Sequence, residues 1–339
     1  VRYKGKYPKK FEEKYKELQP EKYKDTIEHV IQKGNTPAGM HISIMVKEII
    51  DFLNIQPGEI GFDATLGYGG HTKAMLKCLN GKGHIYATDV DPEESDKTKK
   101  RLADQGFGED LLTVKLQNFC TIDEIAKEVG GFDFILADLG VSSMQIDNPK
   151  RGFSFKVDGP LDLRLNQEAG ISAAERLDTI TRDELAGMLY ENSDEPYCEE
   201  LAKAITDEIR KGNRIDTTTK LRQVIEKTLD FLPEKEKKDT IKKTCQRTFQ
   251  ALRIDVNREF EVLYEFMEKL PDALRPGGRV AILTFHSGED KLVKKALKEG
   301  YKAGIYSDYA KDVIRPSAQE CAQNGRARST KMRWAVKNK

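Results

Sequence analysis

The chain has 339 residues, and its 57 lysine and arginine residues are balanced by 56 aspartate and glutamate residues. Apolar residues make up 38% of the sequence and are well spread, which excludes an intrinsically disordered chain and allows at least one substantial core. No apolar run is long enough to span a bilayer, and no two of the five cysteines stand at the spacing of a zinc or redox site. We therefore expect a soluble cytoplasmic protein with free thiols, no metal ion and no membrane contact.

The charge is distributed unevenly along the chain. Residues 1–38 carry ten lysine and arginine residues with five aromatic residues among them, and residues 324–339 carry six with no acidic residue. Basic patches can neutralise phosphates, and aromatic rings can stack on bases. The alternative for both runs is a solvated face of a helix or strand, and charge alone does not decide between the two.

Strands and helices alternate along the first part of the chain. Short apolar runs predict strands at residues 60–64, 84–88, 112–116 and 132–137. The spacing of apolar residues around them predicts helices at residues 42–53, 71–79, 92–105 and 121–129. Alternation of this kind is typical of parallel sheets with right-handed crossovers, so we expect an α/β fold with a doubly wound, mostly parallel sheet.

The pattern changes after residue 146. Residues 147–165 contain glycine and proline turn signals and are predicted to form an irregular loop. Helices are predicted at residues 181–191, 197–211 and 218–231, and strand character returns only at residues 279–284. The sequence therefore predicts four parts: an N-terminal extension (1–38), the first part of a sheet domain (39–146), an inserted, mainly helical substrate-recognition domain (147–244), and the rest of the sheet domain with a basic tail (245–339).

A glycine-rich turn joins the first predicted strand to the helix that follows it. Gly67, Gly69 and Gly70 allow a tight turn and a close approach of a ligand to the backbone. Asp89 lies twenty residues beyond Gly69, at the end of the second strand, where a carboxylate can accept hydrogen bonds from both hydroxyl groups of a ribose. The pattern indicates an adenosine-containing ligand at the carboxyl ends of the strands.

The charge near this turn favours one class of adenosine cofactor. The third glycine of the dinucleotide motif is displaced, and Asp63, at the end of the first strand, would repel phosphates. S-adenosylmethionine carries an ammonium and a sulfonium group and no phosphate, so the sequence favours it over a nicotinamide dinucleotide.

Seven segments of the chain match a known family. They are residues 63–71 (DATLGYGGH), 138–143 (DLGVSS) with Gln145, 151–155 (RGFSF), 159–164 (GPLDLR), 247–254 (RTFQALRI), 285–287 (FHS) with Glu289 and Asp290, and 324–329 (NGRARS). Through them the chain resembles the MraW/RsmH family of bacterial methyltransferases from about residue 41 to its C-terminus. The resemblance implies a Rossmann-like methyltransferase sheet, S-adenosyl-L-methionine as cofactor, and methylation of N4 of a cytidine in 16S rRNA of the small ribosomal subunit. Leu163 and Leu165 stand where the family usually has methionine.

The resemblance also implies roles for individual residues. Gly69, Gly70 and His71 would contact the methionine end of the cofactor, and Asp89 would hold its ribose. Phe119 would pack beside the adenine, while Asp138 and Gln145 would complete the pocket.

Asp138, at the end of the fourth predicted strand, is the candidate catalytic residue. The amino group of cytosine is a poor nucleophile because its lone pair is delocalised into the ring. A group that accepts a hydrogen bond from this amine can orient it for in-line methyl transfer. We expect Asp138, or a backbone carbonyl beside it, to do so.

Five residues are candidates for contact with RNA: Phe153, Phe155, Arg164, Arg253 and His286. The target base must be unpaired, and Phe153 and Phe155 could stack on it or could equally form an apolar cover over the cofactor. Arg253 could bind a phosphate or anchor the inserted domain. His286 resembles a general base, but it also fits a helix start or an RNA contact, which we favour because N4 loses its proton readily to solvent.

Two other functions are compatible with parts of the sequence. An NAD-dependent dehydrogenase is disfavoured by the displaced glycine and by Asp63. A non-catalytic RNA-binding or ribosome-assembly protein is disfavoured by the complete set of Gly69, Gly70, Asp89 and Asp138. The sequence leaves open whether the protein forms a homodimer and whether residues 1–38 contact RNA, cover the insert or mediate self-association.

Overall fold

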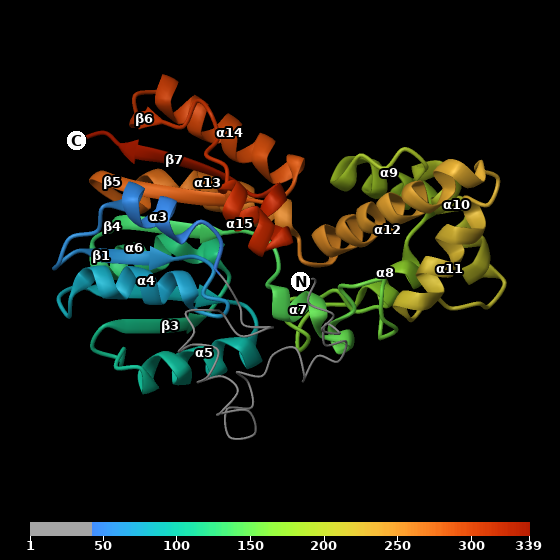
Figure 1. The fold of residues 1–339 in the computed structure, drawn as a ribbon, viewed down its shortest axis with the longest axis horizontal. Helices are drawn as coiled ribbons and strands as arrows, with labels where there is room; N and C mark the ends of the chain where they lie inside the picture. Colours follow the sequence, from blue (N-terminus) through green and yellow to red (C-terminus); the bar gives the residue numbers. More distant parts are fainter. Residues whose placement is uncertain (1–42) are drawn as a thin grey trace, which may run out of the picture.

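The structure, a computed structural model, describes residues 43–339 and is built around a seven-stranded sheet (Figure 1). The strands are β1 (Ile60–Asp63), β2 (His84–Asp89), β3 (Leu112–Leu116), β4 (Phe132–Asp138), β5 (Leu274–Thr284), β6 (Tyr306–Tyr309) and β7 (Lys331–Lys337). Their order is β3-β2-β1-β4-β5-β7-β6. The first five strands pair in parallel, and β7 runs antiparallel to β5 and β6. The predicted doubly wound, mostly parallel sheet is confirmed.

Helices cover both faces of this sheet. One face carries α3 (Val46–Leu53), α4 (Gly70–Leu79) and α5 (Pro92–Asp104), and the other carries α6 (Ile122–Val129), α13 (Glu259–Ala273) and α14 (Ser287–Lys302). Successive side chains of a strand point to opposite sides. In β4, Phe134 and Leu136 accordingly pack in the core under α3, α4 and α5. Ile135 and Ala137 pack in the core under α6, α13 and α14.

The predicted elements of the first part of the chain all form. Each of β1 to β4 ends within one residue of its predicted limits, and so do α4, α5 and α6. The helix predicted from residue 42 begins later, at Val46, because Met45 has a left-handed backbone with φ of 55°. Residue 42 and the extension at residues 1–38 lie outside the described residues.

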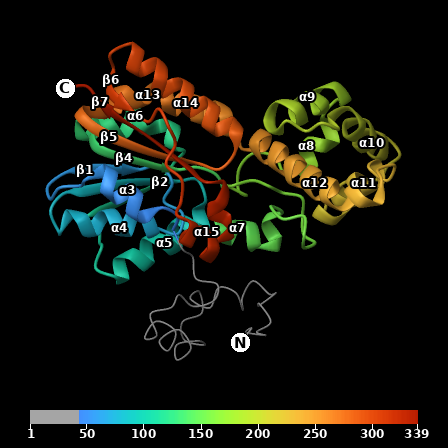
Figure 2. The same ribbon diagram turned by 45° about the horizontal axis from the view of Figure 1, so that its top comes forward.

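The chain between β4 and α13 forms a helical insert beside the sheet domain (Figure 2). Its main helices are α8 (Ala173–Thr179), α9 (Arg182–Ser193), α10 (Cys198–Arg210), α11 (Thr218–Thr228) and α12 (Glu234–Val256). Their apolar faces build a core of their own, in which Leu185, Leu201 and Ile225 are fully buried. The predicted helical insertion is therefore confirmed.

Helix α12 runs across the end of the insert that the sequence predicts. The predicted boundary after residue 244 falls inside α12, and Cys245, Phe249 and Leu252 beyond it pack in the core of the insert. The first half of α12 is dominated by charged residues, so the apolar spacing that would announce one continuous helix is weak there. We propose that the insert extends to Val256.

The basic C-terminal run is part of the sheet and not a free tail. Arg333 in β7 is buried and donates two hydrogen bonds to the Asp290 carboxylate, at 2.7 and 3.1 Å. Lys331 lies 3.2 Å from the same carboxylate, and Lys337 donates to the backbone carbonyl of Leu274 at 2.9 Å. These three cations therefore stabilise the fold, which corrects the expectation of a basic tail. The sequence missed this strand because charged residues hide its apolar alternation.

Short elements complete the fold: α7 (Ser143–Asp147), α15 (Ala318–Gln323) and the 3₁₀ helices η2 (Phe119–Thr121), η3 (Pro149–Arg151) and η4 (Gly325–Ser329). Within residues 43–339, no helix has both the length and the apolar composition needed to cross a membrane. All five cysteines lie in this part of the chain and carry free thiols.

Candidate active site

A cavity of about 380 Å³ lies at the carboxyl ends of the parallel strands, where loops of the sheet domain face the insert. Ligands of open α/β sheets bind at this edge, and the volume is in the usual range of small-molecule sites, roughly 300–1,000 Å³. Nine of the residues predicted from the sequence line the cavity: Gly69, Gly70, His71, Asp89, Phe119, Asp138, Gln145, Arg253 and His286. The fold thus brings together most of the predicted site.

The glycine-rich turn after β1 packs tightly against its neighbours. Gly69 has a φ of 82°, and a Cβ added there would lie 2.7 Å from Cγ2 of Thr98 in α5. A Cβ added at Gly70 would lie 1.9 Å from Oγ of Ser43. At Gly69 the positive φ and the Thr98 methyl group both disfavour any side chain, so this glycine keeps the backbone at the wall of the cavity; at Gly70 the close atom is the end of the Ser43 side chain, which can rotate.

Asp89 presents a carboxylate to the cavity from the end of β2. Its Oδ1 accepts a hydrogen bond from the backbone N–H of Asp91 at 2.9 Å, and its Oδ2 accepts one from Gly67 at 2.8 Å. Burial raises the pKa of Asp89 to about 6, although these backbone donors oppose the shift. A carboxylate oxygen can accept two hydrogen bonds, so both oxygens keep a lone pair for a ligand.

His71 and Asp138 form a pair at the ends of β1 and β4. Nδ1 of His71 lies 3.4 Å from Oδ2 of Asp138, and Nε2 lies 2.7 Å from the carbonyl oxygen of Ile44. Burial disfavours a charged imidazole, but the Asp138 carboxylate and the Ile44 carbonyl outweigh it and raise the pKa of His71. An imidazolium that donates to both groups would fix the Asp138 carboxylate in place and leave its other oxygen open to the cavity.

Asp63 does not contribute to the cavity, contrary to the electrostatic argument from the sequence. Its Oδ2 accepts a hydrogen bond from Thr72 Oγ1 at 2.6 Å, and its Oδ1 accepts one from the Thr65 backbone at 3.0 Å. The residue is fully buried, and burial raises its pKa. The carboxylate that faces the ligand at this point is that of Asp138, one strand away.

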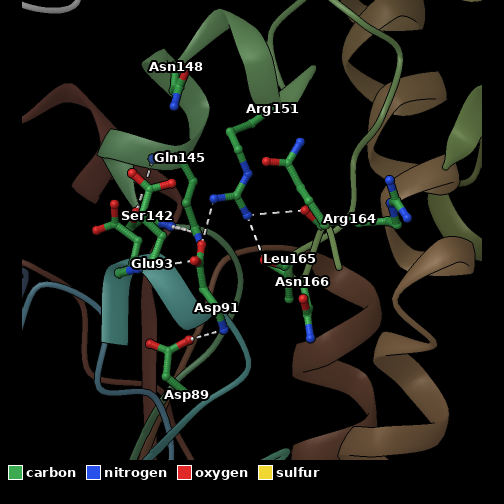
Figure 3. A network of polar contacts seen from close by, with 12 residues as sticks. Asp89, Asp91, Glu93, Ser142, Gln145, Asn148, Arg151, Arg164, Leu165 and Asn166 are labelled. Atoms are coloured by element: carbon green, nitrogen blue, oxygen red, sulfur yellow. Dashed lines mark hydrogen bonds and ion pairs between the residues drawn. The ribbon is translucent and has the colours of Figure 1, made fainter. Parts of the chain in front are cut away.

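A polar network beside the cavity links Gln145, which the sequence predicted in the site, to Asp91 and Arg151, which it did not (Figure 3). The side chain of Gln145 accepts a hydrogen bond from the backbone of Ser142 at 2.9 Å and donates one to Asp91 Oδ2 at 3.1 Å. Nη1 of Arg151 donates to the same oxygen at 2.6 Å, and both partners of this ion pair are almost fully buried. Gln145 therefore reaches the cavity with its polar atoms already bound to the protein.

The local sequence predicts only part of this network. Asp91 precedes Pro92 and caps α5, accepting from the backbone of Glu94 at 3.1 Å, and this pattern is readable as a helix start. Arg151 stands sixty residues later, in the matched segment 151–155. Nothing in its neighbourhood in the sequence indicates Asp91 as its partner.

Phe119 forms an aromatic wall of the cavity on the side of β3. Its ring meets that of Phe266 in α13 edge to face, with centroids 5.2 Å apart. This contact fixes the ring plane next to the loop that carries Asn118, which also lines the cavity. The placement agrees with a ring that packs against a flat ligand group.

The opposite side of the cavity is formed by the insert and its junctions. We call it the insert-side wall, and it consists of Leu165, Gln250, Arg253 and Asn257. The guanidinium of Arg253 donates two hydrogen bonds to the carboxylate of Glu259, at 2.8 and 3.0 Å. This ion pair ties the end of α12 to the start of α13, as the anchoring alternative for Arg253 predicts, while the residue still faces the cavity.

His286 caps α14 at the edge of the cavity. Its Nδ1 accepts a hydrogen bond from the backbone of Glu289 at 3.4 Å, and its Nε2 lies 3.2 Å from Oε1 of Glu289. Burial works against the ionised form of Glu289, but His286 and Arg253 outweigh it and lower the pKa. With Glu259 these residues offer three metal-ligand atoms within 4.8 Å, but the guanidinium of Arg253 already occupies the carboxylate of Glu259. The helix-capping alternative for His286 describes its contacts best.

Three predicted RNA-contact residues do not line the cavity. Phe153 lies in the core of the insert and is only 9% exposed, and Phe155 packs against Phe249 with ring centroids 5.7 Å apart. The guanidinium of Arg164 donates to Asp162, at 2.8 Å from Nε. The loop was expected either to stack on a base or to cover the cofactor; it folds onto the insert, where Phe153 is buried and Phe155 is partly buried.

Comparisons with known proteins were consistent across the chain. A model of the MraW methylase family matches residues 38–338. The chain is 88% identical over 337 residues to ribosomal RNA small subunit methyltransferase H 1 of Agathobacter rectalis, a match that covers 99% of this chain and 97% of the relative. It is 70% identical over 336 residues to the protein of the same name from Lachnoclostridium phytofermentans, covering 99% and 92% of the two chains. A more distant relative, ribosomal RNA small subunit methyltransferase H of Acidobacterium capsulatum, is 36% identical over 301 residues, covering 88% and 98%.

Proposed function

We propose, from the premise that the chain belongs to the MraW methylase family, that it is an S-adenosylmethionine-dependent methyltransferase acting on N4 of a cytidine in 16S rRNA. The observation that carries the proposal is the carboxylate of Asp138, which faces the same cavity as Asp89 and is paired with His71 at 3.4 Å. Two carboxylates on one ligand site suit a ribose and an amino group. Because its substrate would be the small ribosomal subunit, we expect the protein to act in the cytoplasm.

The sheet-domain side of the cavity fits S-adenosylmethionine. Among its lining residues between 43 and 146 there are two carboxylates, Asp89 and Asp138, and no lysine or arginine. Such a lining favours a cationic ligand and offers no lysine or arginine to a pyrophosphate, while both ring nitrogens of His71 are engaged by Asp138 and Ile44, which supports this cofactor over a nicotinamide dinucleotide. When bound, S-adenosylmethionine supplies a methyl group activated by a positively charged sulfur.

We propose that the residues of the chain divide the work of holding this cofactor. Asp89 would accept hydrogen bonds from the ribose hydroxyls, Phe119 would pack on the adenine, and the backbone of Gly69 and Gly70 would lie along the methionine end. Gln145 would act indirectly, since its amide is bound to Ser142 and Asp91.

Asp138 would orient the nucleophile. Its free carboxylate oxygen can accept a hydrogen bond from the N4 amino group, which draws the nitrogen lone pair away from the ring and towards the methyl group. His71 holds this carboxylate in place through the 3.4 Å contact, and its own raised pKa favours the imidazolium that would donate to Asp138. Holding two reactants in line is worth up to ~7–11 kcal/mol in well-aligned systems, so orientation alone can account for much of the catalysis.

The cytosine would enter between Asp138 and the insert-side wall. Gln250, Arg253 and Asn257 bring polar side chains to this side of the cavity. Asp89, which is proposed to bind the ribose of the cofactor, would not contact the base. The base must leave any pairing to reach the cavity, since pairing would engage its amino group. Every residue in this proposal comes from one chain, so a homodimer is not required for it.

The test is methyl transfer from labelled S-adenosylmethionine to small ribosomal subunits from cells that lack this protein, followed by nucleoside analysis. We expect label in N4-methylcytidine at one site. Label in another nucleoside would contradict the choice of atom. Cofactor binding without transfer to subunits or to naked 16S rRNA would favour the non-catalytic assembly protein, and absence of binding would contradict the cofactor assignment.

A further inference from the structure

A strained backbone segment passes the cavity where the chain enters the insert. Leu163 has a φ of 65°, a left-handed conformation that leucine rarely adopts, and its side chain is fully buried in the core of the insert. Two residues later Leu165 reaches the insert-side wall. Strain of this kind persists only where the surroundings fix it, so the contacts that hold residues 163–165 are informative.

Asn257, at the end of α12, holds the segment from one side. Its Nδ2 donates a hydrogen bond to the carbonyl oxygen of Leu163 at 2.7 Å, and its Oδ1 accepts one from the backbone N–H of Leu165 at 2.8 Å. Because Asn257 also lines the cavity, the segment and the end of α12 form one continuous wall.

Arg151 holds the segment from the other side (Figure 3). Its carbonyl oxygen accepts from the N–H of Leu163 at 3.0 Å, and its Nη2 donates to the carbonyl oxygens of Arg164 at 3.2 Å and Leu165 at 2.6 Å. Its Nη1 donates to Asp91 at 2.6 Å. One planar guanidinium thus binds a carboxylate and two carbonyls at once, which the single ammonium of a lysine cannot reproduce.

Asp91 connects this clamp to the cofactor side. Its backbone N–H donates to Oδ1 of Asp89 at 2.9 Å, and its carboxylate also holds Gln145. Arg151 and Asp91 are 5% and 2% exposed, so their ion pair is shielded from water and its geometry is fixed. A short chain of contacts therefore runs from the ribose acid Asp89, through Asp91 and Arg151, to Leu165 on the insert-side wall.

We propose that Arg151 is a positioning residue for methyl transfer: it sets the insert-side wall, and with it the target base, in register with the cofactor loop. Arg151 does not itself line the cavity, so it acts through Leu165 and Asp91. The inference rests on the proposed function and assigns a role that this function leaves open. Misplacement of reacting groups by about 1 Å can lower the rate ~10²-fold, and this is the effect we expect when the clamp is lost.

The kinetic test compares Arg151→Met and Arg151→Lys with Arg176→Met, each normalised to the number of cofactor-binding sites. Arg176 pairs with Asp255 at 2.9 Å and lies outside the cavity, so it controls for loss of an arginine–aspartate pair. We expect the cofactor Kd of Arg151→Met to stay within ~3-fold of wild type and kcat per site to fall ~10²-fold. Arg151→Lys should recover about a tenth of the kcat that Arg151→Met loses. Arg176→Met should have the wild-type kcat. Wild-type kcat per site in Arg151→Met would overturn the proposal.

Arg151→Met leaves the buried Asp91 without its ion-pair partner, which could unfold the protein, and wild type could prove to transfer no methyl group. Two further measurements keep the proposal testable in these cases. The double variant Asp91→Asn with Arg151→Met removes both charges and should fold while remaining slow. Amide hydrogen exchange needs no turnover: residues 163–165 should lose protection in Arg151→Met with cofactor bound, whereas Arg176→Met should not. Unchanged exchange there would overturn the proposal whatever the reaction turns out to be.

Discussion

The two sides of the cavity are built in different ways. On the sheet side, Asp89 and Asp138 are the last residues of β2 and β4, and Gly69 lies in the turn that leaves β1. On the insert side, Leu165 and Asn257 are 92 residues apart in the chain and are joined by a hydrogen bond. The first side follows from local sequence and the second from packing of the insert, so only the first can be located by spacing alone.

The two sides also differ in charge. The cavity lining between residues 43 and 146 has two carboxylates and no lysine or arginine, whereas on the insert side Arg253 is paired with Glu259. The sheet side therefore suits a cationic cofactor, and the insert side offers amide and guanidinium groups to a base. Because the insert has a core separate from the two cores of the sheet domain, changes in one region should leave the other largely intact.

The largest effect is expected for Asp138→Asn, on the sheet side. An amide cannot form the ion pair with His71 and accepts a hydrogen bond from N4 less strongly, so kcat should fall ~10²–10⁴-fold. The cofactor Kd should change much less, which calorimetric titration with S-adenosylmethionine would measure. Asp178→Asn, on the surface of the insert, is the matched control. Full turnover of Asp138→Asn at saturating cofactor would contradict the role of the carboxylate in orienting the amine.

Phe153→Ala tests the independence of the insert. Removal of a buried phenylalanine costs ~3–5 kcal/mol, and Phe153 lies in the core of the insert. We expect urea unfolding to show this loss while the cofactor Kd of the folded protein changes less than twofold. Phe231→Ala, at a residue 67% exposed, should change stability far less. A large rise in the KM for subunits with no loss of stability would instead favour the stacking role predicted from the sequence.

Asp89 gives the sheet side a pH dependence. With a pKa of about 6, the carboxylate is ionised above this pH and protonated below it. The protonated acid loses acceptor capacity, so the cofactor Kd should be constant above pH 6 and rise about tenfold per pH unit below it. Asp89→Asn should weaken binding ~10–100-fold at pH 7.5, because hydrogen bonds to charged groups contribute ~1.5–3 kcal/mol. It should also abolish the pH dependence; persistence of the same profile in this variant would assign the titration to another group.

The smallest effect is expected for Arg328→Gln, in the basic C-terminal run. Arg328 is exposed in η4, and substitution there should change the free energy of unfolding by less than ~0.5 kcal/mol. Arg333→Gln is the contrasting variant, since it leaves the buried carboxylate of Asp290 with a weaker partner and should cost several kcal/mol. Equal stability of the two variants in thermal unfolding would contradict the structural role of the C-terminal strand.

The sequence by itself determined the first four strands of the sheet and the residues at their carboxyl ends. Short apolar runs locate β1 to β4 because a strand covered by helices on both faces must present apolar side chains to both layers. The residues that follow those strands then meet at one edge, whatever the rest of the chain does. Asp89, Asp138 and the glycine turn could be predicted for this reason.

The tertiary structure alone decided the remaining contacts. The partner of Arg151 is Asp91, sixty residues away, and Leu163 takes its strained conformation only between Arg151 and Asn257. The same holds for Asp63, a strand-end acid like Asp138 that turns to Thr72 and away from the cavity, and for Arg333, a cation that is buried against Asp290. Local patterns limit the conformation of a segment, but the partner of a buried charge depends on which distant segment packs against it, and this is fixed only when the whole chain folds.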